Sequence, residues 1–225
     1  MKEKCKTYWN QYKHIVPLLL YGILYSTWFV ALERHVTSDY TMIHMGIDDY
    51  IPFCEVFVIP YFLWFLYVAA IVVYLFFTNK ADYYRLCKFL FIGMTIFLLV
   101  STFFPNGQNL RPITFPRDNI FTHMIAALYQ TDSATNIVPS IHVYNAIGAH
   151  IAIVHCKRLH NQPWVRIGSF VLCLSIILST MLIKQHSMFD VLTACGMAVI
   201  LYAVVYADFN IQTSKEYRIN HDSES

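Results

Sequence analysis

Long apolar stretches alternate with shorter polar segments along this chain, and this pattern predicts its fold. A bilayer core needs about 20 apolar residues per helix, with a range of roughly 17–25. Six stretches meet or approach that length: 15–32, 56–77, 89–104, 140–155, 167–183 and 187–207. The fourth is the weakest, because His142, Asn145 and His150 interrupt it. No small-residue cleavage site follows the first stretch, so we expect it to remain as an anchor. The pattern therefore predicts an all-α fold, a polytopic six-transmembrane-helix bundle that forms a single domain over residues 1–225.

The composition narrows the class of protein. Of the 225 residues, 57% are hydrophobic and 13% are charged, and the mean hydropathy is +0.46. Soluble domains carry about 25% charged residues, so an ordinary soluble, disordered, collagen-like or nucleic-acid-binding protein is excluded. The six cysteines are scattered and form no tightly spaced pair, which indicates neither a disulfide framework nor a zinc site. We expect the membrane as a partner and no nucleic acid, and the sequence leaves the oligomeric state open.

The distribution of Lys and Arg predicts the orientation, because cytoplasmic loops are enriched in these residues. Twelve of the sixteen fall at one set of span ends: Lys2, Lys4, Lys6, Lys13, Lys80, Arg85, Lys88, Lys157, Arg158, Arg166, Lys215 and Arg218. We therefore expect both termini in the cytoplasm, and we expect the plasma membrane as the location. The opposite, extracytoplasmic face is rich in acidic residues: Glu33, Asp39, Asp48, Asp49, Glu55, Asp118, Asp132 and Asp190.

Two polar segments lie on that extracytoplasmic face. Residues 33–53 mix polar and apolar positions, and we expect a short interfacial helix there. Residues 105–139 form a long connection that contains FPNGQNLRP, FPRDN and TDSATNIVPS. Long connections in compact domains are often lids or binding loops, so we expect such a role for this one.

Three clusters of polar residues are predicted to meet at the same face. They are Arg111-Pro112, then Pro139-Ser140-Ile141-His142, then Lys184-Gln185-His186 with Asp190. His186 and Asp190 are four residues apart, so on a helix they would be neighbours on one face. A carboxylate that binds one imidazole nitrogen leaves the other unprotonated and oriented, which suits a nucleophilic histidine.

The same clusters contain groups that suit a phosphate. Pro139 and Ser140 place His142 at the start of the fourth span, where free backbone N–H groups can bind an anion. Arg111, Arg117 and Lys184 supply positive charge at this face. We therefore expect His186, His142 and Asp190 as catalytic residues, with Arg111, Lys184, Ser140 and Arg117 as phosphate-binding residues.

These residues resemble the signatures of the type 2 phosphatidic acid phosphatase superfamily. Ser179-Thr180, five residues, His186, three residues and Asp190 resemble its S-R-x5-H-x3-D signature. Pro139-Ser140-Ile141-His142 resembles P-S-G-H, and Arg111-Pro112 resembles the end of K-x6-R-P. The resemblance covers the chain from about residue 50, and it is nearest to the branch related to inositol phosphorylceramide synthases.

The chain departs from these signatures at three positions. Phe104 replaces the Lys of the first signature, Ile141 the Gly of the second, and Thr180 the Arg of the third. Two phosphate-binding cations are therefore missing. Lys184 lies one helical turn from Thr180, so we expect it on the same face, where it would fill that position, and we expect Arg117 to stand in for the missing Lys.

The resemblance implies metal-independent hydrolysis of a membrane lipid phosphate ester through a phosphohistidine. His186 would attack phosphorus, Asp190 would orient it, and His142 would protonate the leaving alkoxide. The implied enzyme needs no cofactor and no metal. The alternative is a lipid phosphotransferase that passes the phospho-head group to a diacylglycerol- or ceramide-type alcohol. A non-enzymatic scaffold or transporter, and a metal enzyme using the two histidines and Asp190 as ligands, are further readings that mutation and chelation would separate.

Overall fold

The computed structural model describes residues 12–36 and 39–222, with side chains to residue 206. Its α-helices are α2 (Val16–His35), α3 (Val58–Thr78), α4 (Lys80–Phe103), α5 (Ile120–Thr131), α6 (Ile141–His155), α7 (Pro163–Leu182) and α8 (Met188–Asp222). Short 3₁₀ helices lie at η1 (Lys13–Ile15), η2 (Gly46–Asp49), η3 (Glu55–Phe57) and η4 (Lys157–Leu159). The strands β1 (Thr41–Met42) and β2 (Asn106–Gly107) pair in parallel.

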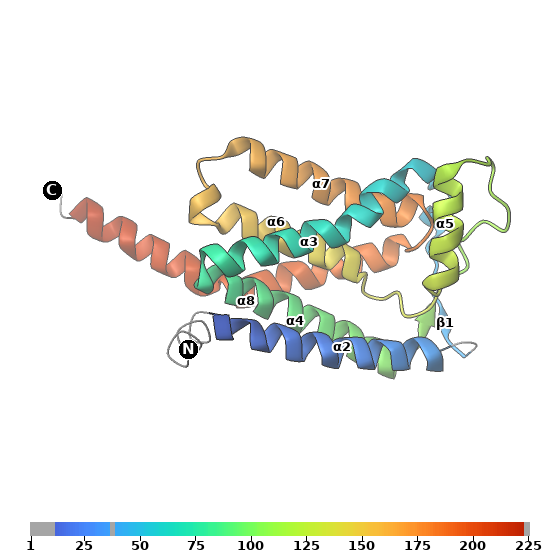
Figure 1. Cartoon of the computed structure of the whole chain (residues 1–225), viewed down its shortest axis with the longest axis horizontal. Coiled ribbons are helices and arrows are strands. Elements are labelled where there is room, and N and C mark those ends of the chain that lie inside the picture. The colour runs from blue at the N-terminus through green and yellow to red at the C-terminus, as the bar shows by residue number, and fades with distance from the viewer. Residues whose placement is uncertain (1–11, 37–38, 223–225) are drawn as a thin grey trace, which may run out of the picture.

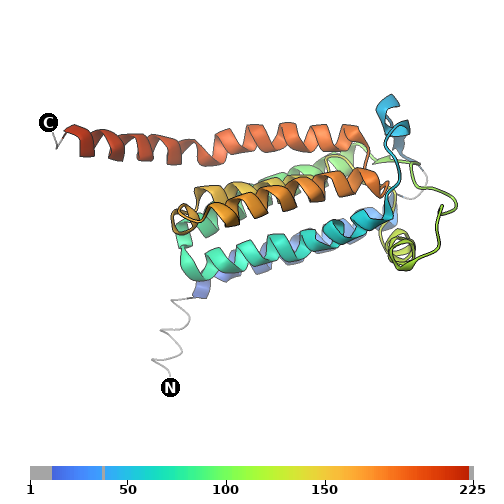
Figure 2. The same cartoon turned by 90° about the horizontal axis from the view of Figure 1, so that it is seen from above.

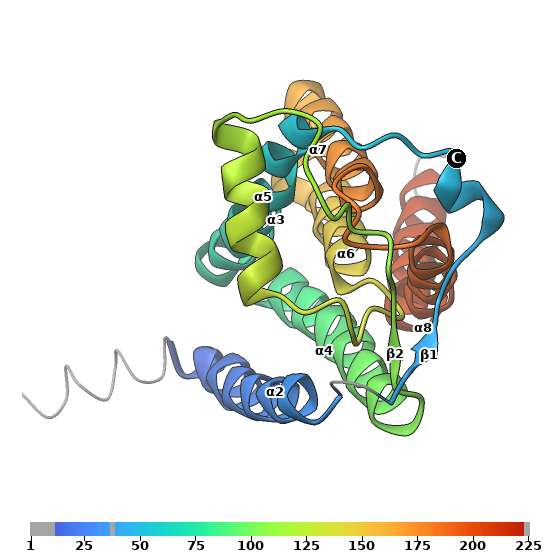
Figure 3. The same cartoon turned by 90° about the vertical axis from the view of Figure 1, so that its right-hand side faces the viewer.

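All the α-helices except α5 run along the long axis of the molecule, and α5 lies across one end (Figure 1). The view along that axis places α6 in the middle, with α3, α4, α7 and α8 around it and α2 outside, against α4 (Figure 3). The far part of α8 extends beyond the bundle at the opposite end from α5 (Figure 2). The largest cluster of buried side chains accordingly surrounds α6.

Within the described residues, five helices are long and apolar enough to cross a membrane: Lys13–His35, Glu55–Thr78, Lys80–Phe103, Pro163–Leu182 and Met188–Tyr206. Large apolar side chains such as Leu20, Phe65 and Val199 are exposed on their outer faces, which is typical of helices that contact lipid. These features indicate a helical membrane protein. The expected span 140–155 forms the 15-residue helix α6, which lies in the bundle but is shorter than the other five, so six spans remain a prediction.

Helix α4 begins nine residues before the expected span 89–104. The side chain of Asn79 accepts hydrogen bonds from the backbone N–H groups of Ala81 and Asp82, which caps the helix at Lys80. Arg85 then pairs with Asp82 at 2.9 Å, so the first turns stay helical although they are charged. Hydropathy alone misses these turns, because polar residues at a helix end can face the membrane surface.

The polar segments at the α5 end are more ordered than expected. The described part of residues 33–53 contains the end of α2, the strand β1 and the short 3₁₀ helix η2. The connection 105–139 contains α5, which is capped by Asn119 and buries Thr122 and Ile125. The Oδ1 atom of Asn106, a fully buried residue, accepts hydrogen bonds from the backbone N–H groups of Ile137 and Val138. The long connection is therefore a folded cap over the bundle.

Part of the charge pattern falls outside what the structure describes. Lys2, Lys4 and Lys6 lie outside the described residues, and the side chains of Lys215 and Arg218 are not described. The remaining predicted cytoplasmic segments, at the α3–α4 junction and between α6 and α7, lie at the end opposite to α5 (Figure 1). The orientation in the membrane stays a prediction.

Candidate functional site

Ser140 and the start of α6 position His142. The fully buried Ser140 is the N-cap, and its hydroxyl accepts a hydrogen bond from the Val143 N–H at 3.4 Å. His142 therefore lies in the first turn of α6. Its ring packs between two side chains of α3, with ring centroids 4.6 Å from Tyr61 and 4.3 Å from Trp64.

His186 lies in the short connection between α7 and α8. Its Nδ1 atom is 3.2 Å from Oδ2 of Asp190, and Asp190 is fully buried. The same oxygen accepts the Ser187 backbone N–H at 2.9 Å, so Asp190 also closes the first turn of α8. When Nδ1 donates to the carboxylate, Nε2 of the neutral His186 ring carries no proton and its lone pair is free.

The local structure differs from the one on which this pairing was predicted. Helix α7 ends at Leu182 and α8 begins at Met188, so His186 is not on a helix with Asp190. The contact forms because Asp190 lies in the first turn of α8 and faces back toward the connection. Lys184 has a positive φ of 55°, which breaks the register that would have placed it above Thr180.

Asp48, on the 3₁₀ helix η2, holds the connection from outside. One carboxylate oxygen accepts the Ser187 hydroxyl at 2.6 Å, and the other accepts the Met188 N–H at 2.8 Å. Burial opposes the ionisation of Asp48, but the hydrogen bonds from Met188 and Ser187 outweigh it and lower its pKa. A backbone hydrogen bond of 3.2 Å from Ser140 to Asp190 joins the start of α6 to the same unit.

The two histidines face one small cavity at the α5 end of the bundle. Their ring centroids are 5.7 Å apart, with the ring planes inclined at 59°. The cavity volume is about 30 Å³, and its polar lining includes Glu33, Asp132, Asn136 and Gln185. A volume of that size holds about one water molecule. A group larger than a water molecule would fit there only if lining side chains moved.

Arg111 lies behind the cavity rather than in it. Its guanidinium donates to the backbone carbonyls of Asp132 at 3.0 Å and Ser133 at 2.8 Å, and to the side chain of Gln185. Gln185 in turn donates to Asp132 at 3.0 Å. Burial lowers the pKa of Arg111, against the opposite effect of Asp132. Arg111 does not line the cavity itself, but it binds the side chain of Gln185, which does.

Lys184 and Arg117 are directed elsewhere. The Lys184 ammonium donates to the backbone carbonyls of Asp48 at 2.8 Å and Ile51 at 2.6 Å. Arg117 forms a two-pronged ion pair with Glu55 at 2.6 and 2.8 Å, and these hydrogen bonds raise its pKa. Neither residue lines the cavity, so the structure does not support the phosphate-binding role expected for them.

The sequence-based prediction assigned no site role to three acidic residues around the histidines: Glu33, Asp48 and Asp132. It placed all three on the expected outer face but did not identify the residues that they contact. Gln185 belonged to a predicted cluster, but its contact with Arg111 was not predicted. Burial raises the pKa of Asp132, against the opposite effects of His186 and Arg111. No group of three or more His, Cys, Asp or Glu side chains is arranged to hold a metal ion within the part of the chain that the structure describes.

Comparison with known proteins gives no match, whether against protein-family models, curated proteins or solved structures. The resemblance to the phosphatase superfamily therefore depends on the signature residues and their spacing.

Proposed function

We propose that this protein hydrolyses the phosphate ester of a membrane lipid through a phosphohistidine on His186. The observation that carries the proposal is the convergence of two histidines on one buried cavity, with the Asp190 carboxylate on Nδ1 of one of them. The first turn of α6, the α7–α8 connection and the first turn of α8 bring these three residues together, in the order and spacing of the superfamily signatures. We place the reaction at the extracytoplasmic face of the plasma membrane, with both termini in the cytoplasm.

The proposed reaction has two steps, formation of the phosphohistidine and its hydrolysis. In the first, Nε2 of His186 attacks phosphorus and the bond from phosphorus to the lipid oxygen breaks, while His142 gives that oxygen a proton. Asp190 stabilises the positive charge that develops on the His186 ring. In the second, His142 takes a proton from a water molecule, whose oxygen attacks phosphorus. The bond from phosphorus to nitrogen then breaks and releases inorganic phosphate.

Three features reduce the negative charge that an incoming phosphate meets. The first turn of α6 directs its positive end toward the cavity from Ser140. Arg111 polarises Gln185, which lines the cavity. Burial raises the pKa of Asp132 and so opposes the formation of a second negative charge beside the phosphate.

The two histidines are expected to fail in different ways when replaced. General acid–base help contributes typically 10²–10⁴-fold to a rate. We expect His142→Ala to lose a factor of that order in kcat/KM on phosphatidic acid, and much less on p-nitrophenyl phosphate, whose leaving group needs no proton. His186→Ala should abolish turnover of both substrates and form no phosphoenzyme, and Asp190→Asn should fall between the two.

The matched control is His123→Ala. His123 lies on α5 at the same end of the molecule, but it is exposed and pairs with Asp118 at 2.6 Å. Its replacement should leave both activities unchanged. An equal loss for His142→Ala on both substrates would contradict the proton-donor role, and a phosphoenzyme in His186→Ala would contradict the nucleophile.

A second candidate is transfer of the phospho-head group to a lipid alcohol. The observation that favours it is an apolar cavity between α2, α3 and α4, whose lining includes Trp64, the ring neighbour of His142. The assay that separates the two functions offers a phospholipid with and without diacylglycerol. Free phosphate indicates hydrolysis, and a new phospholipid indicates transfer.

A further inference from the structure

A pocket of about 370 Å³ lies between α6 and α7, toward the end of the bundle opposite to α5. Its lining consists of His150 and Val154 from α6 and of Pro163, Arg166, Ile167 and Phe170 from α7. Two of these side chains, those of His150 and Arg166, are polar. Because His150 follows His142 by eight residues, about 12 Å along the helix axis, this pocket is separate from the candidate site.

Buried hydroxyl groups orient the ring of His150. The Tyr67 hydroxyl on α3 lies 2.6 Å from the Ser169 hydroxyl on α7, which lies 2.9 Å from Nδ1 of His150. When Tyr67 donates to Ser169 and Ser169 donates to Nδ1, the neutral ring carries its proton on Nε2. Nε2 has no hydrogen-bond partner among the described residues, and it is not one of the polar atoms that the protein encloses. The pocket therefore has an oriented N–H donor that a ligand can reach.

Arg166 gives the pocket a positive charge without an acidic partner. Its side chain is half-buried, and its guanidinium forms no hydrogen bond or ion pair within the part of the chain that the structure describes. Arg85, by contrast, pairs with Asp82 at 2.9 Å. The sequence contains no Asp or Glu between Asp132 and Asp190, so neither α6 nor α7 can supply a carboxylate. The charge of Arg166 is available to a ligand.

The position of the pocket suits a lipid head group. Arg166 lies in the first turn of α7, and the nearby Trp164 is 82% exposed, as is typical of aromatic side chains at a membrane surface. Ile167 and Phe170 continue the pocket along α7, and both are exposed. The distribution of Lys and Arg assigns this end to the cytoplasmic leaflet, where anionic lipids are concentrated.

From this arrangement we infer that the pocket binds the phosphate of an anionic glycerophospholipid of the phosphatidylglycerol type, with an acyl chain along Ile167 and Phe170. Arg166 and His150 both present donors to the pocket, which favours an anion, and arginine binds two phosphate oxygens at once. Basic pockets between membrane helices bind such head groups. The inference is independent of the proposed function, because this phosphodiester lies at the other end of the bundle from His186 and is not a substrate.

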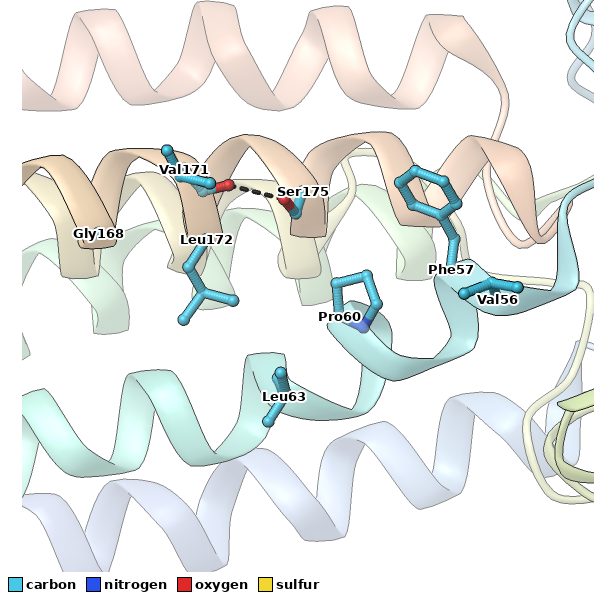
Figure 4. Close-up of a pocket in the computed structure, with 8 residues that line it drawn as sticks. All are labelled: Val56, Phe57, Pro60, Leu63, Gly168, Val171, Leu172 and Ser175. Carbon is cyan, nitrogen blue, oxygen red and sulfur yellow. Dashed lines mark hydrogen bonds between the residues drawn. The ribbon is translucent and has the colours of Figure 1, made fainter.

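A larger groove on another face of α7 provides the contrast (Figure 4). It lies between α3 and α7, has a volume of about 470 Å³, and is lined mostly by apolar side chains. Its one hydroxyl, on Ser175, already donates to the Val171 carbonyl at 2.8 Å. Among the described residues, no charged side chain lines this groove. Any membrane lipid can cover it, so we assign it no specific ligand.

Two arginines make a matched pair for the test. Arg166 lines the pocket, whereas Arg158 is exposed in η4 at the same end of the molecule and does not line it. Arg166→Gln and Arg158→Gln each remove one positive charge, so they differ in whether that charge faces the pocket. Neither guanidinium has a partner among the described residues, so we expect both variants to unfold at the temperature of the unchanged protein.

The experiment titrates the full chain in detergent with phosphatidylglycerol or with phosphatidylcholine of the same chain length, and native mass spectrometry gives the two dissociation constants. We expect the unchanged protein to prefer phosphatidylglycerol about tenfold, because a charged hydrogen bond contributes about 1.5–3 kcal/mol and the choline cation opposes Arg166. Arg166→Gln should abolish the preference, and Arg158→Gln should change it less than about twofold. Equal binding of the two lipids by the unchanged protein, or the same loss in both variants, would overturn the inference.

A second variant tests the histidine, and it also keeps the inference testable if Arg166→Gln does not fold. His150→Phe keeps an aromatic ring but has no donor, and Ser169 keeps Tyr67 as a partner, so the preference should fall about threefold. An unchanged preference would overturn the assigned contact with His150.

Two further arms test the place of the ligand and its source. A phosphatidylglycerol with a photoreactive diazirine on one chain should label Val154, Ile167 or Phe170, and adducts confined to the α3–α7 groove would overturn the location. Glycerophosphoglycerol, the same head group without chains, should compete only at concentrations at least about 100-fold higher, because it buries no acyl chain. Equal competition would show that the pocket takes a soluble phosphate ester and not a lipid.

Discussion

At the scale of single residues, Asp48 supports the candidate site without lining it. It is almost completely buried, and it accepts hydrogen bonds from Ser187 and Met188, directly after His186. The neighbouring residue Asp49 has a side chain that is 64% exposed and pairs with His44 at the surface. Adjacent carboxylates on one short 3₁₀ helix thus differ in how much the structure depends on them.

We expect Asp48→Asn to lower the free energy of unfolding by about 1–3 kcal/mol, because a buried donor loses its acceptor. Asp49→Asn should change it little, since exposed pairs contribute about 0–1 kcal/mol. Thermal unfolding in detergent measures both.

The stabilisation by Asp48 should also depend on pH. The Asp48 pKa is lowered in the folded state, so its contribution to the free energy of unfolding is present above the ordinary Asp pKa of about 3.9 and is lost as the pH falls below that value. The gap between Asp48→Asn and the unchanged protein should therefore narrow in acid. A gap that stays constant with pH would show that the charge of Asp48 is not what stabilises the connection.

Some residues of the candidate site can be identified from the sequence alone, and others cannot. His142, His186 and Asp190 could be selected because their chemistry and spacing identify them together. The direction of Lys184 could not, because it depends on where α7 ends and on the left-handed backbone at that residue. Asp48 is 139 residues from its partner Ser187, and no local pattern records a contact of that separation.

At the scale of elements, the close contact of α4 with α6 fixes the position of His142. The Phe89 and Tyr144 rings stack at 4.6 Å, and the Tyr144 hydroxyl donates to the Phe89 carbonyl at 2.7 Å. The ring of Tyr144 lies directly over Gly93, so close that an added Cβ atom would overlap it. Apolar periodicity predicts both helices, but it does not show which faces meet or that glycine makes the contact possible.

We expect Gly93→Ala to destabilise the protein by about 1–3 kcal/mol, because the added methyl group must displace a buried aromatic ring. Gly196→Ala is the control. Gly196 lies in α8, where a Cβ atom meets nothing within 4 Å, so alanine there should be neutral or stabilise the helix by about 0.5–1 kcal/mol. Unfolding temperatures in detergent compare the two. A Gly93→Ala protein as stable as Gly196→Ala would mean that α4 and α6 pack less closely than described.

At the scale of the whole molecule, the helices place the polar connections at two ends, and the candidate site lies at only one of them. The α5 end carries His142, His186 and Arg111, and the other end carries the α3–α4 and α6–α7 connections (Figure 1). This separation agrees with the grouping made from Lys and Arg. The distribution of Lys and Arg predicts which end faces the cytoplasm.

Cysteine labelling tests that orientation, and the structure selects the positions. Gln108, in the middle of the long connection, is 2% exposed and bonded to the Lys184 carbonyl, so a probe there would not react in the folded protein. Ile113 is fully exposed at the α5 end, and Asn161 is exposed in the α6–α7 connection. In a background without the native cysteines, a membrane-impermeant maleimide should modify Ile113→Cys in intact cells and Asn161→Cys only after permeabilisation. The reverse pattern would place the histidines in the cytoplasm. The cavity would then face cytoplasmic substrates. A reversed orientation would therefore change the source of the lipid phosphate, but it would leave the chemistry proposed for His142 and His186 unchanged.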